Sequence, residues 1–301
     1  MSTVPHLVQY QGSKRLIADE ILKHIPEGTS RIIEPFSGTC AVSILAAHTH
    51  KCSSFWLNDI NKPLIEMIEA CVDDPGKLAE DYARVWEKQF EEGNNNVDYF
   101  FRVRDDFNSG SQDAARMLFL LARVVKGAVR YNAHGQMNQS CDKRRFGTKP
   151  TVIKKNAHSI SKLLKGKTIF SSVDYRDVLR MAQPGDLVYM DPPYQGTSSK
   201  DTTRDNRYIQ GVDFDEFVEA LSDLNARGID YIVSYDGMTG DRQIGSMLPS
   251  HLKLTHIYIN AGLSAQSILN GKKEVTLESL YLSPNLRLQD DDFTQLKFEL
   301  A

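Results

Sequence analysis

The sequence has few of the features that mark membrane, secreted or metal-stabilised proteins. No apolar run in its 301 residues approaches the roughly 20 residues that a membrane-spanning helix requires, and the N-terminus lacks the apolar stretch of a signal peptide. The four cysteines form no CxxC pair and no cluster with metal-ligand spacing; they are Cys40, Cys52, Cys71 and Cys141. We therefore expect reduced thiols in a reducing cytosol, no bound metal and no membrane partner.

The composition is otherwise that of an ordinary globular protein. Hydrophobic residues make up 41% of the chain and charged residues 25%, with no internal repeat and no low-complexity tract. A chain of this length can bury a large core, either as one large domain or as a domain that carries an insert.

Positive charge is concentrated in one window of an otherwise acidic chain. Between Lys126 and Lys167 there are eleven lysines and arginines and one acid, Asp142, so the window carries +10 although the whole chain carries −3. A solvated basic surface is one interpretation of such a run. Because the remaining residues carry −13, we favour a surface that binds a polyanion, with nucleic acid as the leading candidate.

Strand and helix patterns alternate in two separate blocks. The first block, up to residue 61, has a strand pattern at 31–34, a helix from residue 41 and a second strand at 54–59. The second block begins near residue 168, with strands at 168–170, 186–190 and 230–234, helices at 175–181 and 213–226, and a terminal strand pair at 254–260 and 279–282. This β-α-β spacing predicts a mostly parallel α/β sheet formed by residues 1–61 and 168–301.

Residues 62–167 have a different character. Helical patterns cover 64–72, 100–107 and 114–125, and the basic stretch, rich in glycine and asparagine, follows them. We interpret this range as an inserted, mainly helical module within a doubly wound sheet.

The loop at 34–39, EPFSGT, lies between a predicted strand and a predicted helix, where open α/β sheets bind ligands. Gly38 would let ligand atoms approach the backbone closely. Asp59 ends the next strand, 21 residues later, which is the spacing of a carboxylate that binds a ribose diol. A plain tight turn and a helix N-cap are the structural alternatives. Loop and acid together predict an adenosine-containing ligand, without choosing between NAD and S-adenosylmethionine.

A second candidate segment, YQGSK at residues 10–14, precedes a helical pattern. Ser13 is a plausible N-cap, which is the structural interpretation. In the functional interpretation, Lys14 pairs with an anionic group of the ligand near the helix start, and Tyr10 covers the ligand.

The motif Asp191-Pro192-Pro193-Tyr194 follows the strand pattern at 186–190. A stiff turn would explain the prolines alone. The Asp191 carboxylate and the Pro192 carbonyl are both acceptors, however, and two acceptors suit an exocyclic amino group, while Tyr194 offers a flat face for stacking. A nucleobase must leave the duplex to reach such a pocket.

Six motifs in this order resemble those of the Dam-type (alpha-group) DNA adenine-N6 methyltransferases. They are Tyr10-Gln-Gly-Ser-Lys14, Glu34-Pro-Phe-Ser-Gly38, Asp59, Arg130-Tyr131-Asn132, Ser172-Val173-Asp174 and Asp191-Pro-Pro-Tyr194. The resemblance spans most of the chain. It implies a class I S-adenosylmethionine-dependent methyltransferase fold, Rossmann-like, with a mostly parallel seven-stranded sheet whose last strand is antiparallel. It also implies that residues 62–167 form the target-recognition domain.

The resemblance implies roles for individual residues. Tyr10 and Lys14 would hold the methionine end of S-adenosylmethionine, and Phe36 with Gly38 would line its site. Asp59 would bind the ribose hydroxyls, and Asp174 would accept a hydrogen bond from the adenine amino group of the cofactor. The catalytic residues that hold the target adenine would be Asp191, Pro192 and Tyr194.

The expected DNA contacts lie in the basic window. Arg130 corresponds to a family position that touches DNA, and Arg130 or Arg144 is our candidate for reading guanine in the major groove. The predicted DNA-binding set is Lys126, Arg130, Asn132, Lys143, Arg144, Arg145 and Lys149. The run VKGA at 125–128 departs from the pattern of GATC-specific members, so the target sequence stays open. We expect the polar, basic stretch at 196–208 to form a mobile loop over the base or at the phosphates.

The implied reaction is methylation of N6 of a flipped adenine in duplex DNA, with S-adenosylhomocysteine as product. We expect a cytoplasmic monomer of a bacterial or phage-infected cell, with a companion restriction endonuclease as a further candidate partner. Cytosine-N4 methylation is an alternative, although it usually goes with Ser in place of Asp191. RNA or protein glutamine methylation, a dinucleotide-dependent oxidoreductase and a non-catalytic DNA-binding protein are others. The oxidoreductase leaves the Asp-Pro-Pro-Tyr motif and the basic insert unused. A non-catalytic DNA-binding protein would be expected to have lost Asp191 or Gly38, and both are present.

Overall fold

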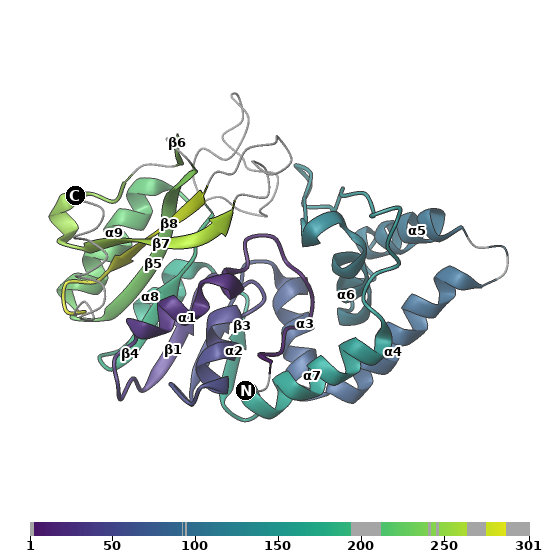
Figure 1. Cartoon of the computed structure of the whole chain (residues 1–301), viewed down its shortest axis with the longest axis horizontal. Coiled ribbons are helices and arrows are strands. Elements are labelled where there is room, and N and C mark those ends of the chain that lie inside the picture. The colour runs from purple at the N-terminus through teal and green to yellow at the C-terminus, as the bar shows by residue number, and fades with distance from the viewer. Residues whose placement is uncertain are drawn as a thin grey trace.

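The structure is a computed structural model that describes residues 3–91, 93, 95–193, 212–239, 242–244, 247–263 and 275–286. A mixed sheet with helices on both faces forms one side of the molecule and a helical module forms the other (Figure 1). The strands are β1 (Arg31–Glu34), β2 (Phe55–Asn58), β3 (Thr168–Ser171), β4 (Asp186–Met190), β5 (Asp230–Thr239), β6 (Arg242–Ile244), β7 (Thr255–Leu263) and β8 (Val275–Leu282).

The main sheet has the strand order β3-β2-β1-β4-β5-β8-β7, and β6 pairs with β5 outside this path. Strands β1 to β5 are parallel, whereas β8 is antiparallel to both of its neighbours. The order confirms the predicted class I methyltransferase arrangement, with the last strand reversed. The chain leaves β1 toward one edge and returns at β4 on the other side, and ligands bind beyond the carboxyl ends of strands at such a switch point.

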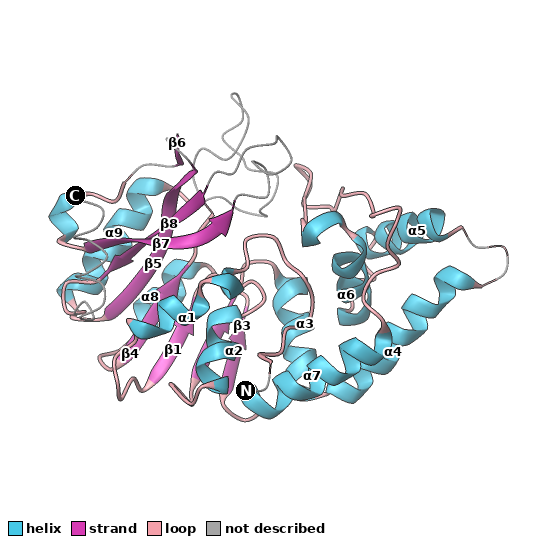
Figure 2. Cartoon of the chain, viewed as in Figure 1, coloured by secondary structure: helices cyan, strands magenta, loops and turns pink. Residues whose placement is uncertain are grey.

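Nine helices are described, and helices cover both faces of the sheet (Figure 2). They are α1 (Ala18–Lys23), α2 (Ala41–His48), α3 (Lys62–Asp73), α4 (Pro75–Glu87), α5 (Asn96–Asn108), α6 (Ala114–Arg123), α7 (Pro150–Leu164), α8 (Tyr175–Met181) and α9 (Phe214–Ala226), with short 3-10 helices η1 (Lys14–Leu16), η2 (Lys88–Phe90), η3 (Val125–Gly127) and η4 (Ser250–Leu252). Within the described part of the chain, none of them is long and apolar enough to cross a membrane.

Alternate residues of the central strands point to opposite layers, as the pleat of a strand requires. Leu187 and Tyr189 of β4 pack in the cluster that includes residues of α1, α2, α3 and α7, whereas Val188 and Met190 pack with α8 and α9. All five residues of β4 are buried. Burial on both faces explains why these strands are continuous apolar runs in the sequence.

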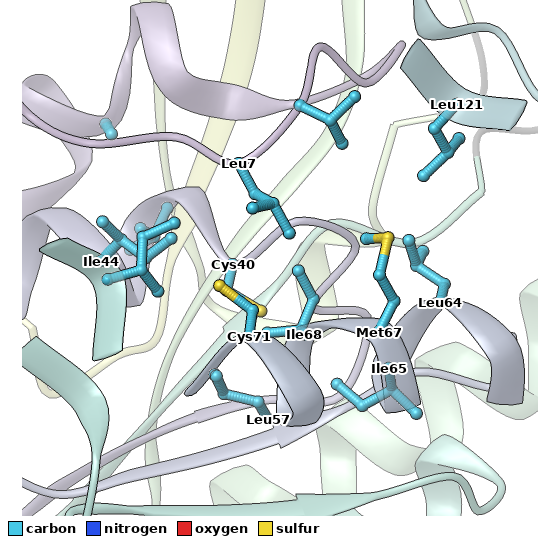
Figure 3. Close-up of a cluster of buried hydrophobic side chains, with 14 of the residues drawn as sticks. Leu7, Cys40, Ile44, Leu57, Leu64, Ile65, Met67, Ile68, Cys71 and Leu121 are labelled. Carbon is cyan, nitrogen blue, oxygen red and sulfur yellow. The ribbon is translucent and has the colours of Figure 1, made fainter. Parts of the chain in front are cut away.

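One hydrophobic core extends from the sheet into the helical module. Leu57 of β2, Ile68 of α3 and Leu121 of α6 belong to the same cluster (Figure 3). Buried residues of α7 join this cluster as well, and α7 packs against α2, α3 and α4. Helices α3 and α7 therefore fill the space between the sheet and α4 to α6. The division at residues 61 and 168 stays a prediction.

The helices predicted within 64–72, 100–107 and 114–125 are present as α3, α5 and α6. Two further helices were missed, α4 and α7. In α4 the apolar residues Leu78, Tyr82 and Val85 have helical spacing after the N-cap Asp74, so a usable signal existed. In α7 the lysines of the basic window obscured a buried face that begins at Ile153.

Candidate active site

A cavity opens at the carboxyl ends of β1, β2 and β4. All six residues that were predicted to bind the cofactor line this single cavity, together with the predicted catalytic acid; they are Tyr10, Lys14, Phe36, Gly38, Asp59, Asp174 and Asp191. Pro193 also lines the cavity, and Pro192 is buried beside it. Tyr194 and the predicted loop at 196–208 lie outside the described residues.

The Gly38 loop and Asp59 are joined directly. Gly38 has φ +50°, a backbone conformation that strains any residue with a side chain, whereas a Cβ there would make only an ordinary contact of 3.5 Å with a ring carbon of Tyr10. The amide of Gly38 donates to Asp59 Oδ2 at 2.9 Å, and the amide of Asn61 donates to Oδ1 at 2.9 Å. Burial raises the pKa of the Asp59 carboxyl to about 6, which these two hydrogen bonds oppose. Donors supplied by a ligand would stabilise the charged form further.

Asp174 has two structural tasks of its own. Its carboxylate caps α8 by accepting from the amide of Arg176, and it pairs with the Arg176 guanidinium at 2.8 and 3.0 Å. The side-chain hydrogen bond from Arg176 holds the pKa of Asp174 below its ordinary value. Asp174 is therefore a fixed, ionised acceptor at the cavity wall.

Asp191 is held by Lys14. The Lys14 ammonium lies 2.8 Å from Oδ1 and 2.9 Å from Oδ2 of Asp191, and 4.0 Å from Glu278 Oε2. Lys14 is 8% exposed and Asp191 20% exposed, so this ion pair is only partly shielded from water. The residue was predicted to meet an anionic ligand group; in this structure it meets the predicted catalytic acid, which it orients.

Several cavity residues received no role from the sequence. Glu34 is buried at the end of β1, and its Oε1 accepts from the amide of Ser43 at 2.8 Å in α2. Burial raises the pKa of Glu34 to about 7. The cavity is also lined by Ile60, Asn61, Tyr131, Val173, Tyr175, Tyr189 and Val212. Glu34, Tyr131 and Val173 belong to the quoted motifs, and Ile60 and Tyr175 flank motif residues, so a signal existed for these five.

The part of the basic window that precedes α7 forms a short hairpin and a loop on the surface of the module. Tyr131 and Met137 pair across the hairpin, and Asn132 orders its turn by accepting from the amides of His134 and Gln136. Five predicted DNA-binding residues are exposed: Arg130, Lys143, Arg144, Arg145 and Lys149. Asn132 is half-buried and committed to the turn, and the Lys126 side chain lies outside what the structure describes.

Two side chains hold the backbone of the loop that carries Lys143, Arg144 and Arg145. The buried guanidinium of Arg123 donates to the carbonyl of Arg145 and to Asn96 Oδ1, and the Trp86 indole donates to the carbonyl of Phe146 at 2.7 Å. The backbone is thereby fixed while the charged side chains point to solvent. Exposed cations on an anchored backbone suit the phosphates of a rigid duplex.

The strand order and the contents of the cavity define a class I methyltransferase-like protein. A family model described as D12 class N6 adenine-specific DNA methyltransferase matches residues 10–277. The chain belongs to this family, which confirms the family and the enzyme class expected from the motifs.

Curated relatives agree with this membership. The retron Ec67 DNA adenine methylase of Escherichia coli is 31% identical over 204 residues, which cover 66% of each chain. The DNA adenine methylase of Serratia marcescens is 29% identical over 196 residues, 64% of this chain and 67% of that one. The type II methyltransferase M.MjaIII of Methanocaldococcus jannaschii is 26% identical over 204 residues, 64% of this chain and 70% of that one. The matched stretches thus span about two thirds of the first two relatives.

Proposed function

We propose that this protein transfers a methyl group from S-adenosylmethionine to N6 of an adenine that has left the stack of duplex DNA. The observation that carries the proposal is the position of Asp191 on the wall of the cavity that Gly38, Asp59 and Asp174 also line. A carboxylate for an amino group and a site for an adenosine-containing donor thus open into one space.

The residues of the cavity fit S-adenosylmethionine. Asp59 is a buried carboxylate with a raised pKa, and the described contacts to its oxygens come from backbone amides, so hydroxyl donors of a ribose suit it. Asp174 offers an ionised acceptor for an adenine amino group. When bound, the cofactor supplies an electrophilic methyl group on a sulfonium.

For methyl transfer, the protein has to align the amino nitrogen with the methyl group and to supply two hydrogen-bond acceptors. The nitrogen lone pair of an adenine amino group is delocalised into the ring, which makes it a poor nucleophile. Hydrogen bonds to Asp191 and to the Pro192 carbonyl would favour a pyramidal nitrogen with a usable lone pair. Positive charge grows on that nitrogen in the transition state, so a nearby carboxylate stabilises it. Alignment contributes up to roughly 7–11 kcal/mol in good cases.

Cofactor affinity is expected to fall at low pH. Ribose hydroxyls bind the ionised form of Asp59, whose pKa in the free protein is about 6, so affinity should be constant well above pH 6 and drop up to about tenfold per pH unit below it. Calorimetry with S-adenosylhomocysteine between pH 5 and 8 measures this. In Asp59→Asn the inflection near 6 should vanish, and any inflection near 7 that remains belongs to Glu34. An unchanged profile in Asp59→Asn would contradict the ribose role.

DNA affinity is expected to fall steeply with salt. If the exposed cations Lys143, Arg144, Arg145 and Lys149 each neutralise one phosphate, raising salt from about 50 to 200 mM should weaken binding roughly a hundredfold. Fluorescence anisotropy with an unmodified duplex gives the slope. Lys143→Ala with Lys149→Ala should reduce that slope by about two, and an affinity indifferent to salt would exclude phosphate contacts by this loop.

The proposal extends to partners and location. Duplex DNA is the proposed substrate, and we propose a cytoplasmic monomer. A companion restriction endonuclease is supported only by relatives that are named type II methyltransferases. The protein itself carries no further signal for such a nuclease.

One experiment separates the proposed reaction from its alternatives. The protein is incubated with duplex DNA and S-adenosylmethionine labelled in the methyl group, and the modified nucleoside is identified after digestion. N6-methyladenine is the expected product. Label in N4-methylcytosine, or label only in RNA or protein offered in parallel, would overturn the proposal.

A further inference from the structure

A buried hydrogen bond joins the helical module to the cavity. Asn61 Nδ2 donates to the hydroxyl oxygen of Tyr131 at 2.7 Å, although the two residues lie 70 positions apart in the sequence. Both side chains line the cavity, and they are only 5% and 4% exposed. Neither has a role in the mechanism proposed above.

The Asn61 side chain does not serve the helix that it precedes. Asparagine at an N-cap normally accepts from the amides of the first turn. At the start of α3 the side chain of Asn61 makes no such bond, and its backbone carbonyl accepts from the amide of Leu64 at 2.9 Å. The amide side chain is therefore available to the cavity.

The side-chain oxygen of Asn61, Oδ1, lacks a hydrogen-bond donor among the described residues, although this oxygen is buried. Buried acceptors almost always have a partner, and one without a partner is costly. The backbone amide of Asn61 already holds Asp59 Oδ1, so the unpaired oxygen belongs to the segment that is proposed to bind the ribose. A ligand in the cavity is the natural source of the missing donor.

The position of Tyr131 determines that of the hairpin formed by residues 130–138, which we call the recognition hairpin. It pairs with Met137 across the hairpin, and Asn108 brackets Met137 through two hydrogen bonds of 2.9 Å. The preceding residue, Arg130, is exposed, as expected for neighbours on extended backbone, which point to opposite sides. A shift of Tyr131 toward or away from the cavity therefore shifts the arginine that is proposed to read DNA.

We propose that Asn61 couples the two ligands: Oδ1 accepts from a hydroxyl or ammonium donor of the cofactor, while Nδ2 holds Tyr131 and with it the recognition hairpin. Asn61 and Tyr131 are then positioning residues through which cofactor binding favours the hairpin position that binds DNA. This inference rests on the proposed function. Coupling of this kind is reciprocal, so each ligand raises the affinity for the other by the same factor.

The test compares DNA affinity with and without saturating S-adenosylhomocysteine in the full-length protein. We expect the wild type to bind duplex DNA about fivefold tighter or more when the product is bound. In Tyr131→Phe the ratio should fall to near one. Tyr99→Phe is the matched control, because it removes another buried hydroxyl of the module, one that donates to the Val85 carbonyl away from the cavity, and it should keep the wild-type ratio.

A ratio in Tyr131→Phe equal to that of the control would overturn the proposal, as would a wild-type ratio of one. If Tyr131→Phe does not fold, hydrogen exchange of the wild type decides the question. Product alone should then protect amides at 130–138, and a lack of protection counts against the bridge. Failure of the proposed function is distinct, since the wild type would then neither bind the product nor methylate DNA.

Binding of two cofactor analogues to Asn61→Ala shows which group of the cofactor donates to Oδ1. Weaker binding of both 5′-methylthioadenosine and S-adenosylhomocysteine indicates a ribose hydroxyl, because the first compound lacks the amino-acid end. Weaker binding of S-adenosylhomocysteine alone indicates the ammonium group. Unchanged affinity for both compounds would show that Oδ1 takes no cofactor donor.

Discussion

Asp191→Ala should lose at least roughly 10²–10³-fold in the rate of methyl transfer while duplex DNA is still bound. The variant removes one of the two acceptors proposed for the amino group and the charge that opposes the positive nitrogen. It also separates Lys14 from its 2.8 Å partner, so a loss of about 1–3 kcal/mol in stability is expected as well. Single-turnover transfer from labelled cofactor and anisotropy with the same duplex measure the two functions separately.

The matched control for this variant lies at the other end of the same strand. Asp186 begins β4 and pairs with Arg31 at 2.7 and 3.1 Å, and it is 7% exposed. Asp186→Ala breaks a comparable ion pair away from the cavity, so it should lower stability and spare the transfer rate. If both variants kept similar turnover, Asp191 would have no part in the chemistry.

Gly127→Ala should disrupt the site without changing any residue that touches a ligand. A Cβ at this position would lie 2.0 Å from the Gln9 carbonyl oxygen and 2.9 Å from the Cα of Tyr10, and the residue has φ +64°. The clash is with backbone, so the segment that carries Tyr10 and Lys14 must move. We expect unfolding to become easier by about 2–5 kcal/mol, from conformational strain and overpacking together, with a parallel loss of affinity for S-adenosylhomocysteine.

Gly135→Ala is the control that measures backbone strain without a steric clash. Gly135 has φ +72°, and no atom of the described chain lies within 4 Å of the position that its Cβ would take. Only the cost of the left-handed backbone, about 1–2 kcal/mol, is expected there, and cofactor affinity should be unchanged. Denaturant unfolding of both variants gives the difference. Equal losses would mean that the contact between Gly127 and Gln9 does not hold the cavity together.

The sequence predicted which residues line the cavity better than it predicted the contacts between them. Parallel strands end at one edge of a sheet, so strand-end residues such as Gly38, Asp59 and Asp191 were bound to meet once the strands were recognised. The pairing of Lys14 with Asp191 joins residues 177 positions apart, and no local pattern encodes it. The bond between Asn61 and Tyr131 is of the same kind.

The same limit applies to individual side chains outside the cavity. Asn132 is predicted to contact DNA, and that role stays a prediction; the structure shows in addition that its side-chain oxygen closes a turn. A side-chain oxygen that folds back on its own backbone is common for asparagine in turns. Local chemistry allows both uses, so the motif alone did not reveal the turn.

The unbroken core that runs from Leu57 through Ile68 to Leu121 has a consequence for engineering target specificity. Grafting the whole helical module from a relative would cut through close-packed side chains, and mismatched volumes there are poorly tolerated. The exposed positions of the hairpin and loop between residues 130 and 149 can be exchanged with far less disturbance, provided that the buried residues Tyr131, Met137 and Cys141, which belong to the same core, are kept. New specificities are therefore best sought by exchanging these exposed residues while the core of the helical module stays intact.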